Sequence, residues 1–366
     1  MKIKITALLI LLFGSVCFGQ IEIMNDFQLG EFGVGFKNER ITDFSRSFEQ
    51  DYRSVQLFLW YPTQDRSQKA IQYEQYFGFN DPAGKWSESG SMSKRIDSLV
   101  PMEVKKLNEV NNLPVELSKY KMLKTIAQIE APVVAGQFPL LLFAPGGNTS
   151  SQLHSVICEY LASHGYIVAS FPSLGNTSSQ KWPFNQVGLN LQIDDMSLVI
   201  NHLKQNMSQV NIDKTGLIAW SVGGVSQGIY SMKNSNIDMF ISLDSGLGRV
   251  YGVNMLKESP YFNYANFQIP YLHLTGDQPE TYKVERSSEF YDSIPSVNKH
   301  SLVIKEFAHQ HFPSQLGIIP ALASDPMDKK IVDAYKRMCR LVLVFSNRHL
   351  KNSGAADKEW MKLIKN

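Results

Sequence analysis

The feature that most constrains the fold is a series of short, continuously apolar segments between residues 138 and 304 of this 366-residue chain. Apolar runs of this length are typical of strands that are buried on both faces, as in a parallel sheet. Helical patterns separate several of them, and helices that alternate with parallel strands cover both faces of the sheet. The sequence therefore predicts an α/β fold, with strands at 138–143, 167–171, 216–220, 239–243, 271–274 and 302–304.

The expected helices are recognised by the spacing of their apolar residues. The segments 153–164 and 191–203 place apolar side chains three or four residues apart, and Gly165 ends the first of them. A long helix is expected at 329–350, where one apolar face would close over the sheet.

The first part of the chain has a different organisation. The β-like segments 32–36 and 55–60 look like an antiparallel opening to the sheet. The stretch 64–135 is polar, with aromatic patches, and is helix-like from 115 to 129. It is too long for a simple loop, so we expect a single domain over 20–366 with an insertion at 64–135. Whether this insertion covers a site as a lid or packs on the surface stays open.

Composition excludes several classes of function. The chain is 43% hydrophobic, which is enough to bury a sizeable core. Its 36 basic and 34 acidic residues leave a net charge of +2, without the basic excess typical of proteins that bind nucleic acid. We therefore expect no nucleic-acid partner.

The N-terminus has the pattern of a secretory signal peptide. Two lysines precede an apolar run at 5–16, and small residues at Cys17 and Gly19 provide a cleavage site near Gly19-Gln20. The run is shorter than the ~20 residues that span a bilayer, so we expect no stable membrane anchor. The prediction is removal of residues 1–19 and export to the periplasm or the exterior. Acylation of Cys17 stays open, although the bulky Val16 before it is unfavourable.

Two cysteines remain after the signal peptide, Cys158 and Cys339. Both lie in apolar, helix-like stretches, where two buried free thiols are expected rather than a disulfide.

The segment 216–224 carries the clearest chemical signal. An apolar strand leads directly into Ser221, and Gly223 and Gly224 open the helix-like segment that follows. This is a variant of the G-x-S-x-G nucleophile elbow, with Ala219 at the first position. The turn needs small residues on both sides of the serine because strand and helix nearly touch there. We therefore predict Ser221 as a nucleophile.

A nucleophilic serine needs a base that is held by an acid. His309 lies just beyond the last predicted core strand, where a base returning to the carboxyl edge of the sheet is expected, and His311 and His300 are reserve candidates. Asp244 directly follows the strand 239–243 and is the favoured acid. Asp277 and Glu280, after the next strand, stay open as alternatives.

The oxyanion of an ester intermediate needs two backbone N–H donors. Val222, directly after the nucleophile, is expected to supply one. Gly147, in the loop after 138–143, is expected to supply the other. His309 and His311 also have a spacing that could face a metal ion, but no H-E-x-x-H motif or companion cluster accompanies them, so we expect neither a metal nor a cofactor.

These residues resemble a known group of enzymes. The loop after 138–143, the segment 161–168, the elbow at Ser221, Leu243-Asp244 and Ala308-His309-Gln310 are similar to bacterial α/β-hydrolases related to plasma-type platelet-activating-factor acetylhydrolase and dienelactone hydrolase. The likeness covers most of residues 32–350 and is least over 64–120. It implies the α/β-hydrolase fold, with a mostly parallel central sheet, helices on both faces and an insertion before the first core parallel strand.

The resemblance also implies the roles of the site residues. In the acetylhydrolase branch the acid follows the strand after the elbow, as Asp244 does here. Ala219 departs from the glycine that the family usually has, and Trp220 before the serine is similar to cutinase-like polyester hydrolases. The triad implied is Ser221, Asp244 and His309, with oxyanion donors at Gly147 and Val222.

Together these features predict an exported serine hydrolase that cleaves small carboxylic esters, with short acyl or acetyl groups and including phospholipid-like esters, through an acyl-enzyme. An amidase or peptidase, a polyester hydrolase and a catalytically inactive hydrolase-fold binding protein stay open as alternatives, since fold and triad do not fix the substrate.

Overall fold

The computed structural model describes residues 20–48, 51–65, 69–79, 89–111, 114–173, 181–279 and 284–365. The predicted signal peptide at 1–19 lies outside these residues and stays a prediction. No helix in the described part of the chain has the length and apolarity required to cross a bilayer.

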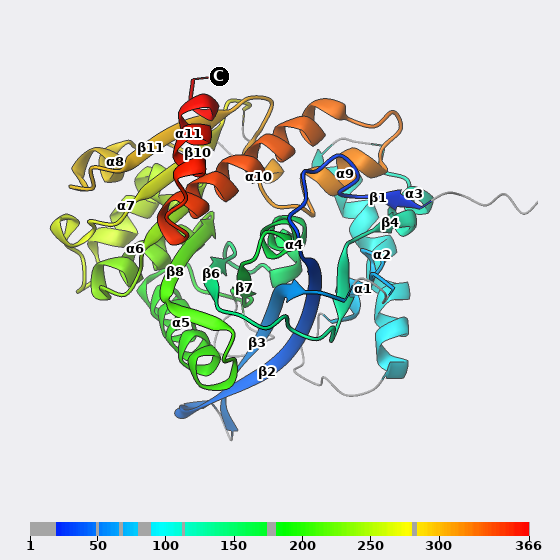
Figure 1. Cartoon of the computed structure of the whole chain (residues 1–366), viewed down its shortest axis with the longest axis horizontal. Coiled ribbons are helices and arrows are strands. Elements are labelled where there is room, and N and C mark those ends of the chain that lie inside the picture. Colours follow the sequence, from blue (N-terminus) through cyan, green and yellow to red (C-terminus); the bar gives the residue numbers. More distant parts are fainter. Residues whose placement is uncertain are drawn as a thin grey trace, which may run out of the picture.

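A nine-stranded sheet organises the described residues (Figure 1). Its strand order is β11-β10-β9-β8-β6-β7-β3-β2-β5. The strands from β6 to β11 run parallel, whereas β3 is antiparallel to both β7 and β2. The bounds are β2 Gly33–Phe48, β3 Asp51–Thr63, β5 Ala127–Ile129, β6 Phe138–Ala144, β7 Ile167–Ser170, β8 Val210–Trp220, β9 Met239–Leu243, β10 Tyr271–Gly276 and β11 Lys299–Ile304.

The predicted mostly parallel sheet with an antiparallel opening is confirmed. All six predicted core strands form, and every residue of β7 and β9 is buried. A separate pair of very short strands, β1 (Ile21–Glu22) and β4 (Leu123–Lys124), lies outside the main sheet.

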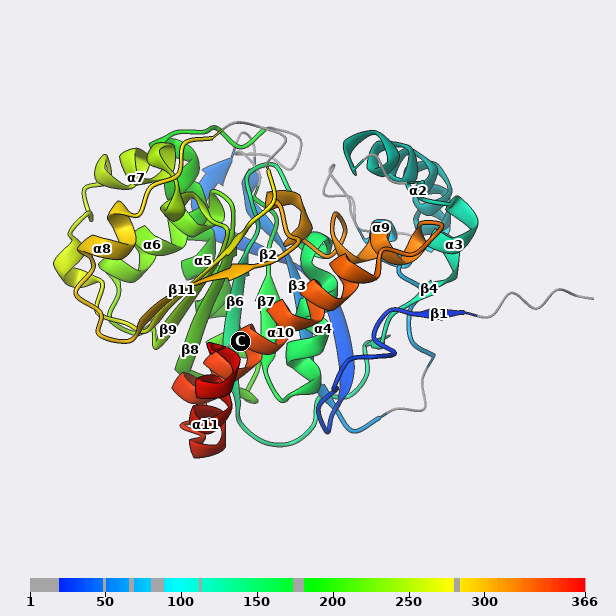
Figure 2. The same cartoon turned by 90° about the horizontal axis from the view of Figure 1, so that it is seen from above.

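Helices cover both faces of the sheet (Figure 2), because side chains on both faces of its strands are apolar. One layer holds α4 (Ser155–Ser163), α10 (Lys329–Leu350) and α11 (Gly354–Leu363). The opposite layer holds α5 (Gln186–Asn206), α6 (Gly223–Lys233), α7 (Val250–Lys257) and α8 (Glu289–Ser293). Further short helices are α3 (Leu117–Met122), α9 (Ile318–Ala323), η1 (Ser151–His154), η2 (Gly246–Gly248), η3 (Tyr264–Asn266) and η4 (His309–His311).

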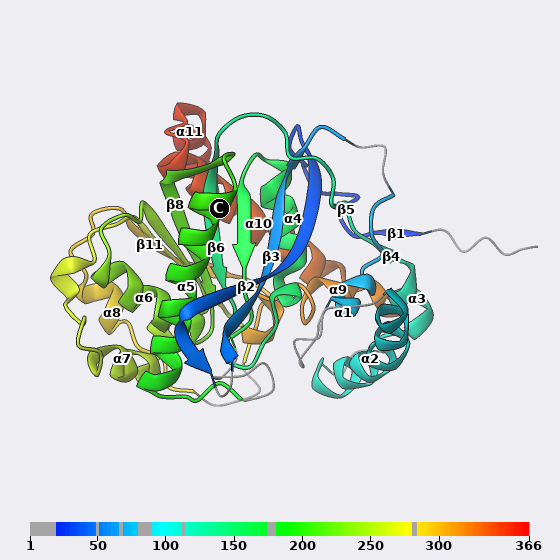
Figure 3. The same cartoon turned by 90° about the horizontal axis from the view of Figure 1, so that it is seen from below.

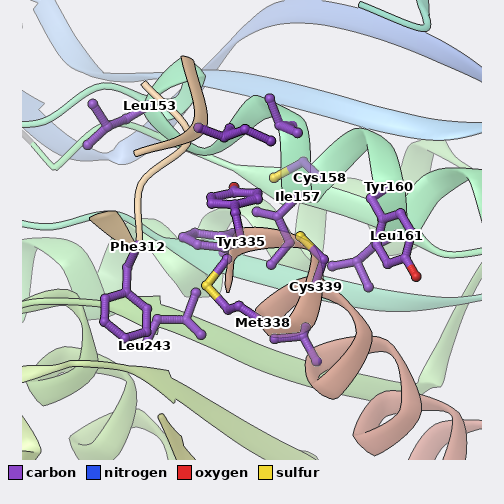
Figure 4. Packing of buried hydrophobic residues seen from close by; sticks show 14 of the residues in the cluster. Leu153, Ile157, Cys158, Tyr160, Leu161, Leu243, Phe312, Tyr335, Met338 and Cys339 are labelled. Carbon is purple, nitrogen blue, oxygen red and sulfur yellow. The ribbon is translucent and has the colours of Figure 1, made fainter. Parts of the chain in front are cut away.

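The core between α4 and α10 contains the two cysteines (Figure 4). Cys158 and Cys339 are buried and free, as predicted. Burial raises the pKa of both thiols well above the ordinary value. They are therefore apolar packing groups rather than reactive thiolates.

The prediction of a helix over 115–129 is wrong for most of that segment. Only α3 is helical there, and the chain then extends through β4 and β5. Burial in this stretch alternates, with Leu123, Thr125 and Ala127 buried and the residues between them partly exposed. That alternation suits an extended edge, and β5 pairs with β2.

The insertion also contains a helix that the sequence pattern did not indicate. After the short α1 (Gln75–Gly78), α2 (Ser89–Asn111) lies at the carboxyl edge of the parallel strands, across that edge from α7 (Figure 3). Gln315 Nε2 donates to Glu103 Oε1 at 2.6 Å, which joins α2 to the segment that follows η4. A lid and simple surface packing both stay open for 64–135.

A buried carboxylate links the insertion to the sheet and to α4. Glu159 accepts hydrogen bonds from the Tyr76 hydroxyl at 2.6 Å and from Ile126 N–H at 2.9 Å. Tyr76 in turn accepts from Trp60 Nε1 at 2.8 Å. Burial raises the pKa of Glu159 to about 7, against the opposing effect of these hydrogen bonds.

Glu159 should make stability pH-dependent. Because its folded-state pKa lies above the ordinary 4.5, the folded protein binds the proton more tightly, so this contribution to stability falls as the pH rises from about 4.5 to about 7. Between pH 5 and pH 8, the free energy of unfolding of the Glu159→Gln variant should rise by roughly 2 kcal/mol relative to that of the parent. Urea unfolding at the two pH values measures this change. For the control Glu258→Gln, which changes an exposed residue, the difference in unfolding free energy from the parent should be the same at both pH values. An equal parent-to-variant difference at the two pH values for Glu159→Gln would contradict this expectation.

Candidate active site

Strand pairing gathers the candidate residues at the carboxyl edge of the sheet. Ala144, the last residue of β6, pairs with Ala219 of β8, so the loop with Gly146 and Gly147 lies beside the elbow. On the other side, Trp220 pairs with Leu243, which places Asp244 beside Ser221. Ligands of open α/β sheets bind at this edge.

Ser221 has the strained backbone of a nucleophile elbow. Its φ is +56°, in the left-handed region that a residue with a side chain rarely adopts. The Ser221 carbonyl accepts from Gly246 N–H at 2.7 Å and from Gly224 N–H at 3.2 Å. These bonds hold the turn in its strained form, and α6 begins two residues later at Gly223.

The small residues around the serine have a steric cause. A Cβ on Gly223 would lie 2.5 Å from the Pro145 carbonyl oxygen and 2.7 Å from that of Ala144. Both oxygens belong to the backbone, so no side-chain rotation can relieve the clash. Ala219, where the resembled family usually has glycine, is fully buried beside Ala144 and Ser242, whose small side chains leave room for its methyl group.

Asp244 is the described carboxylate that meets the candidate base. His309 Nδ1 lies 2.9 Å from Asp244 Oδ2. The alternative Asp277 is described too, but its carboxylate instead accepts a bond from Gln278 at 3.0 Å. Glu280 lies outside the described residues. Asp244 also has a left-handed backbone, with φ of +45°, and its side chain is 3% exposed.

Competing effects set the ionisation of Asp244. Burial acts to raise its pKa, but the hydrogen bond and charge of His309 and the charges of Arg249 and Arg286 outweigh burial, so the pKa is lowered. The carboxylate is therefore ionised at neutral pH and can accept the proton on Nδ1 of the imidazole.

Trp220, the residue before Ser221, contacts His309 through both its ring and its indole N–H. The two rings stack with centroids 4.8 Å apart and an interplanar angle of 22°, and Trp220 Nε1 donates to the His309 carbonyl at 3.2 Å. Because Trp220 directly precedes Ser221, this contact fixes the base relative to the elbow. No hydrogen bond joins the Ser221 hydroxyl to another described residue. In free enzymes, the hydrogen bond between a catalytic serine and its histidine often forms fully only when substrate binds.

The reserve histidines have other contacts. His311 Nδ1 accepts from Ala308 N–H at 3.0 Å, and the His311 pKa is lowered by burial. His300 packs on Trp360 with ring centroids 5.0 Å apart, in contact with α11. Within the described residues, no group of three or more His, Cys, Asp or Glu side chains is placed to hold a metal ion.

The two expected oxyanion donors lie side by side. A Cβ built on Gly147 would be 3.2 Å from Val222 Cγ1. Neither the Gly147 N–H nor the Val222 N–H donates to an acceptor among the described residues, so both are available to a ligand atom. A Cβ on Gly146 would lie 3.0 Å from the Ser221 Cβ, which shows how closely this loop approaches the nucleophile.

Two arginines beside the acid were not singled out from the sequence. Arg249 Nη2 donates to Asp244 Oδ2 at 2.6 Å, and Arg286 Nη1 lies 3.9 Å from Oδ1. The one available signal was an arginine within the otherwise apolar stretch 247–253, five residues after the acid. A buried charge in such a stretch needs a partner.

The elbow can be tested by adding one methyl group. Gly223→Ala should lower stability by about 2 kcal/mol or more and reduce turnover, because its Cβ meets backbone oxygens that only a shift of α6 can relieve. Thermal unfolding and ester hydrolysis measure the two effects. Gly228→Ala, in the same helix, meets side-chain carbons of Leu247 and Leu256, the nearest at 3.2 Å, and its stability should stay within about 1 kcal/mol of that of the parent. Equal losses in the two variants would contradict the steric explanation.

Comparisons with known proteins agree with this architecture. A family model described as Chlorophyllase matches residues 103–261, a range that contains Gly147, Ser221 and Asp244 but ends before His309. Chlorophyllase type 0 from Chenopodium album is 27% identical over 237 residues, 58% of this chain; the chain spans 66% of that protein, just under two thirds of its length.

A solved structure, ferulic acid esterase from Streptomyces cinnamoneus, shares the fold with a TM-score of 0.59 at 18% identity. The match covers 93% of this chain and 96% of that one. The expected α/β-hydrolase architecture is therefore confirmed. The chain thus has the fold of the α/β-hydrolases, and over part of its length it is similar in sequence to a chlorophyllase.

Proposed function

We propose that the protein is a serine hydrolase that cleaves carboxylic esters with short acyl groups through an acyl-enzyme. The observation that carries the proposal is the 2.9 Å contact between His309 Nδ1 and the buried Asp244, beside a serine on a strained strand-to-helix turn. A base oriented by an acid next to such a serine is the arrangement that nucleophilic acyl transfer requires.

In the proposed reaction, the Ser221 oxygen attacks the ester carbonyl carbon while His309 Nε2 takes the hydroxyl proton. Asp244 accepts the Nδ1–H bond, which selects the tautomer with a free Nε2 lone pair. The C–O bond to the alcohol then breaks, and His309 gives its proton to the leaving oxygen. Water, activated by the same imidazole, hydrolyses the acyl-enzyme and restores the serine.

The negative oxygen of each tetrahedral intermediate would bind between the N–H groups of Gly147 and Val222, which have no acceptor among the described residues. The N-terminus of α6, which starts at Gly223, adds partial positive charge at the same point.

Apolar side chains beside the oxyanion loop support an uncharged substrate. Phe184 is 61% exposed, yet its Cζ lies 3.1 Å from a Cβ built on Gly147, and Trp182 packs against the same glycine. An exposed aromatic ring in contact with the reaction centre suits an apolar acyl or alcohol group. The predicted leader at 1–19 would place this reaction outside the cytoplasm.

Replacing the nucleophile provides the principal test. The parent should release p-nitrophenol from acetyl and butyryl esters and react with a fluorophosphonate probe. Ser221→Ala should lower kcat/KM by about 10⁴-fold or more and prevent labelling. Ser226→Ala is the matched control, because Ser226 lies in α6, five residues after Ser221, with a buried hydroxyl that has no partner among the described residues. Ester hydrolysis by Ser221→Ala at the parent rate would refute the mechanism.

The role of Phe184 can be measured with an acyl-length series. Phe184→Ala should raise KM for longer acyl or aromatic esters by about tenfold, with less effect on acetyl esters, because an apolar contact surface is lost. Val187→Ala, which alters another exposed apolar residue at 56% exposure, should leave the chain-length preference as in the parent. A uniform change across the series would show that Phe184 does not contact the substrate.

A further inference from the structure

The acid of the proposed triad is shared between two nitrogen donors. Asp244 Oδ2 lies 2.9 Å from His309 Nδ1 and 2.6 Å from Arg249 Nη2. The side chains of Asp244 and Arg249 are each 3% exposed, so this ion pair is removed from solvent. Arg249 therefore contacts the same oxygen that orients the base.

The backbone around Arg249 is held in place. Arg249 N–H donates to the Gly246 carbonyl at 3.0 Å, and the Arg249 carbonyl accepts from Val253 N–H in α7. The backbone of Arg249 also forms an isolated β-bridge with that of Arg286. The guanidinium thus approaches Asp244 from a fixed position.

The other side of the acid turn is a buried network with little charge. Ser242 Oγ donates to Ser245 Oγ at 2.7 Å and lies 2.8 Å from His273 Nδ1. Burial lowers the pKa of His273 to about 4, so His273 is neutral near pH 7. The charged or titratable groups that interact with the Asp244 carboxylate, within the described part of the chain, are His309, Arg249, Arg286 and this neutral His273.

A buried carboxylate next to a neutral imidazole is costly, and the cost falls if either group gains a proton. A buried guanidinium on the carboxylate removes that cost without protonating the imidazole. We propose that Arg249 is a positioning residue of the triad: it fixes the Asp244 carboxylate and balances its charge, which extends the activity of the triad to lower pH. This inference rests on the proposed function.

Arg286 provides a natural comparison within the same site. Its Nη1 lies 3.9 Å from Asp244 Oδ1, and its side chain is 45% exposed. Solvent and salt screen an exposed charge of this kind much more than a buried one. The two arginines therefore separate the effect of a buried, hydrogen-bonded charge from that of a nearby exposed charge.

The experiment measures ester hydrolysis against pH, at low salt and in 1 M NaCl, in the full-length protein and three variants. We call the pH of half-maximal activity on the acidic side the half-point. In Arg249→Gln, the half-point should rise by about one pH unit or more at both salt concentrations. Arg249→Lys keeps the charge but loses the planar fork, so it should keep the parent half-point with a kcat about tenfold lower. Arg286→Gln should shift the half-point less, and 1 M NaCl should remove most of that shift.

The outcomes distinguish this inference from the function on which it rests. A folded Arg249→Gln variant with the parent half-point would overturn the role of Arg249 alone. If that variant does not fold, Arg249→Lys decides: a parent half-point with reduced kcat supports the role, whereas a shifted half-point or the parent kcat overturns it. Activity that survives Ser221→Ala would overturn the proposed function and this inference together.

Discussion

The parallel pairing of β8 with β6 on one side and β9 on the other is the constraint on which the rest of the site depends. Because the three strands end at one edge, the Gly147 loop, the Ser221 turn and the Asp244 turn emerge beside one another. The hydrophobic layers on both faces fix those strands, so burial of apolar surface positions the chemistry. His309 lies outside these three turns, in η4 after β11, and its stacking on Trp220 fixes its position.

Much of this arrangement could be predicted from the sequence, because its determinants are local. Continuous apolar runs indicated the buried strands, and the helix expected at 329–350 matches the bounds of α10. The serine between a strand and two glycines indicated the elbow, since the steric demand that makes Gly223 necessary acts over a few residues. The helix prediction for 115–129 was wrong because strand pairing decides the conformation of this segment. Its partners, β1 for β4 and β2 for β5, are remote in sequence.

The contacts within the site could not be obtained in the same way. Asp244 and Asp277 both follow neighbouring strands, and only the three-dimensional path of the η4 segment determines which carboxylate His309 meets. Arg249 reaches Asp244 because η2 turns the chain back over the acid, and no spacing rule indicates that turn. Contacts of this kind depend on the positions of several helices and strands at once, whereas a sequence motif describes only one local segment.

The hydrogen bond from Gly246 N–H to the Ser221 carbonyl joins two turns that each contain a residue with positive φ. The turns at Ser221 and Asp244 are therefore joined directly, at the carboxyl ends of the neighbouring strands β8 and β9. Among the described residues, segments that border these turns, such as the insertion with α2, contribute none of their hydrogen bonds. A lineage with this fold can thus change the length and sequence of those segments, and with them its choice of substrate, while the distances that govern bond breaking are inherited unchanged.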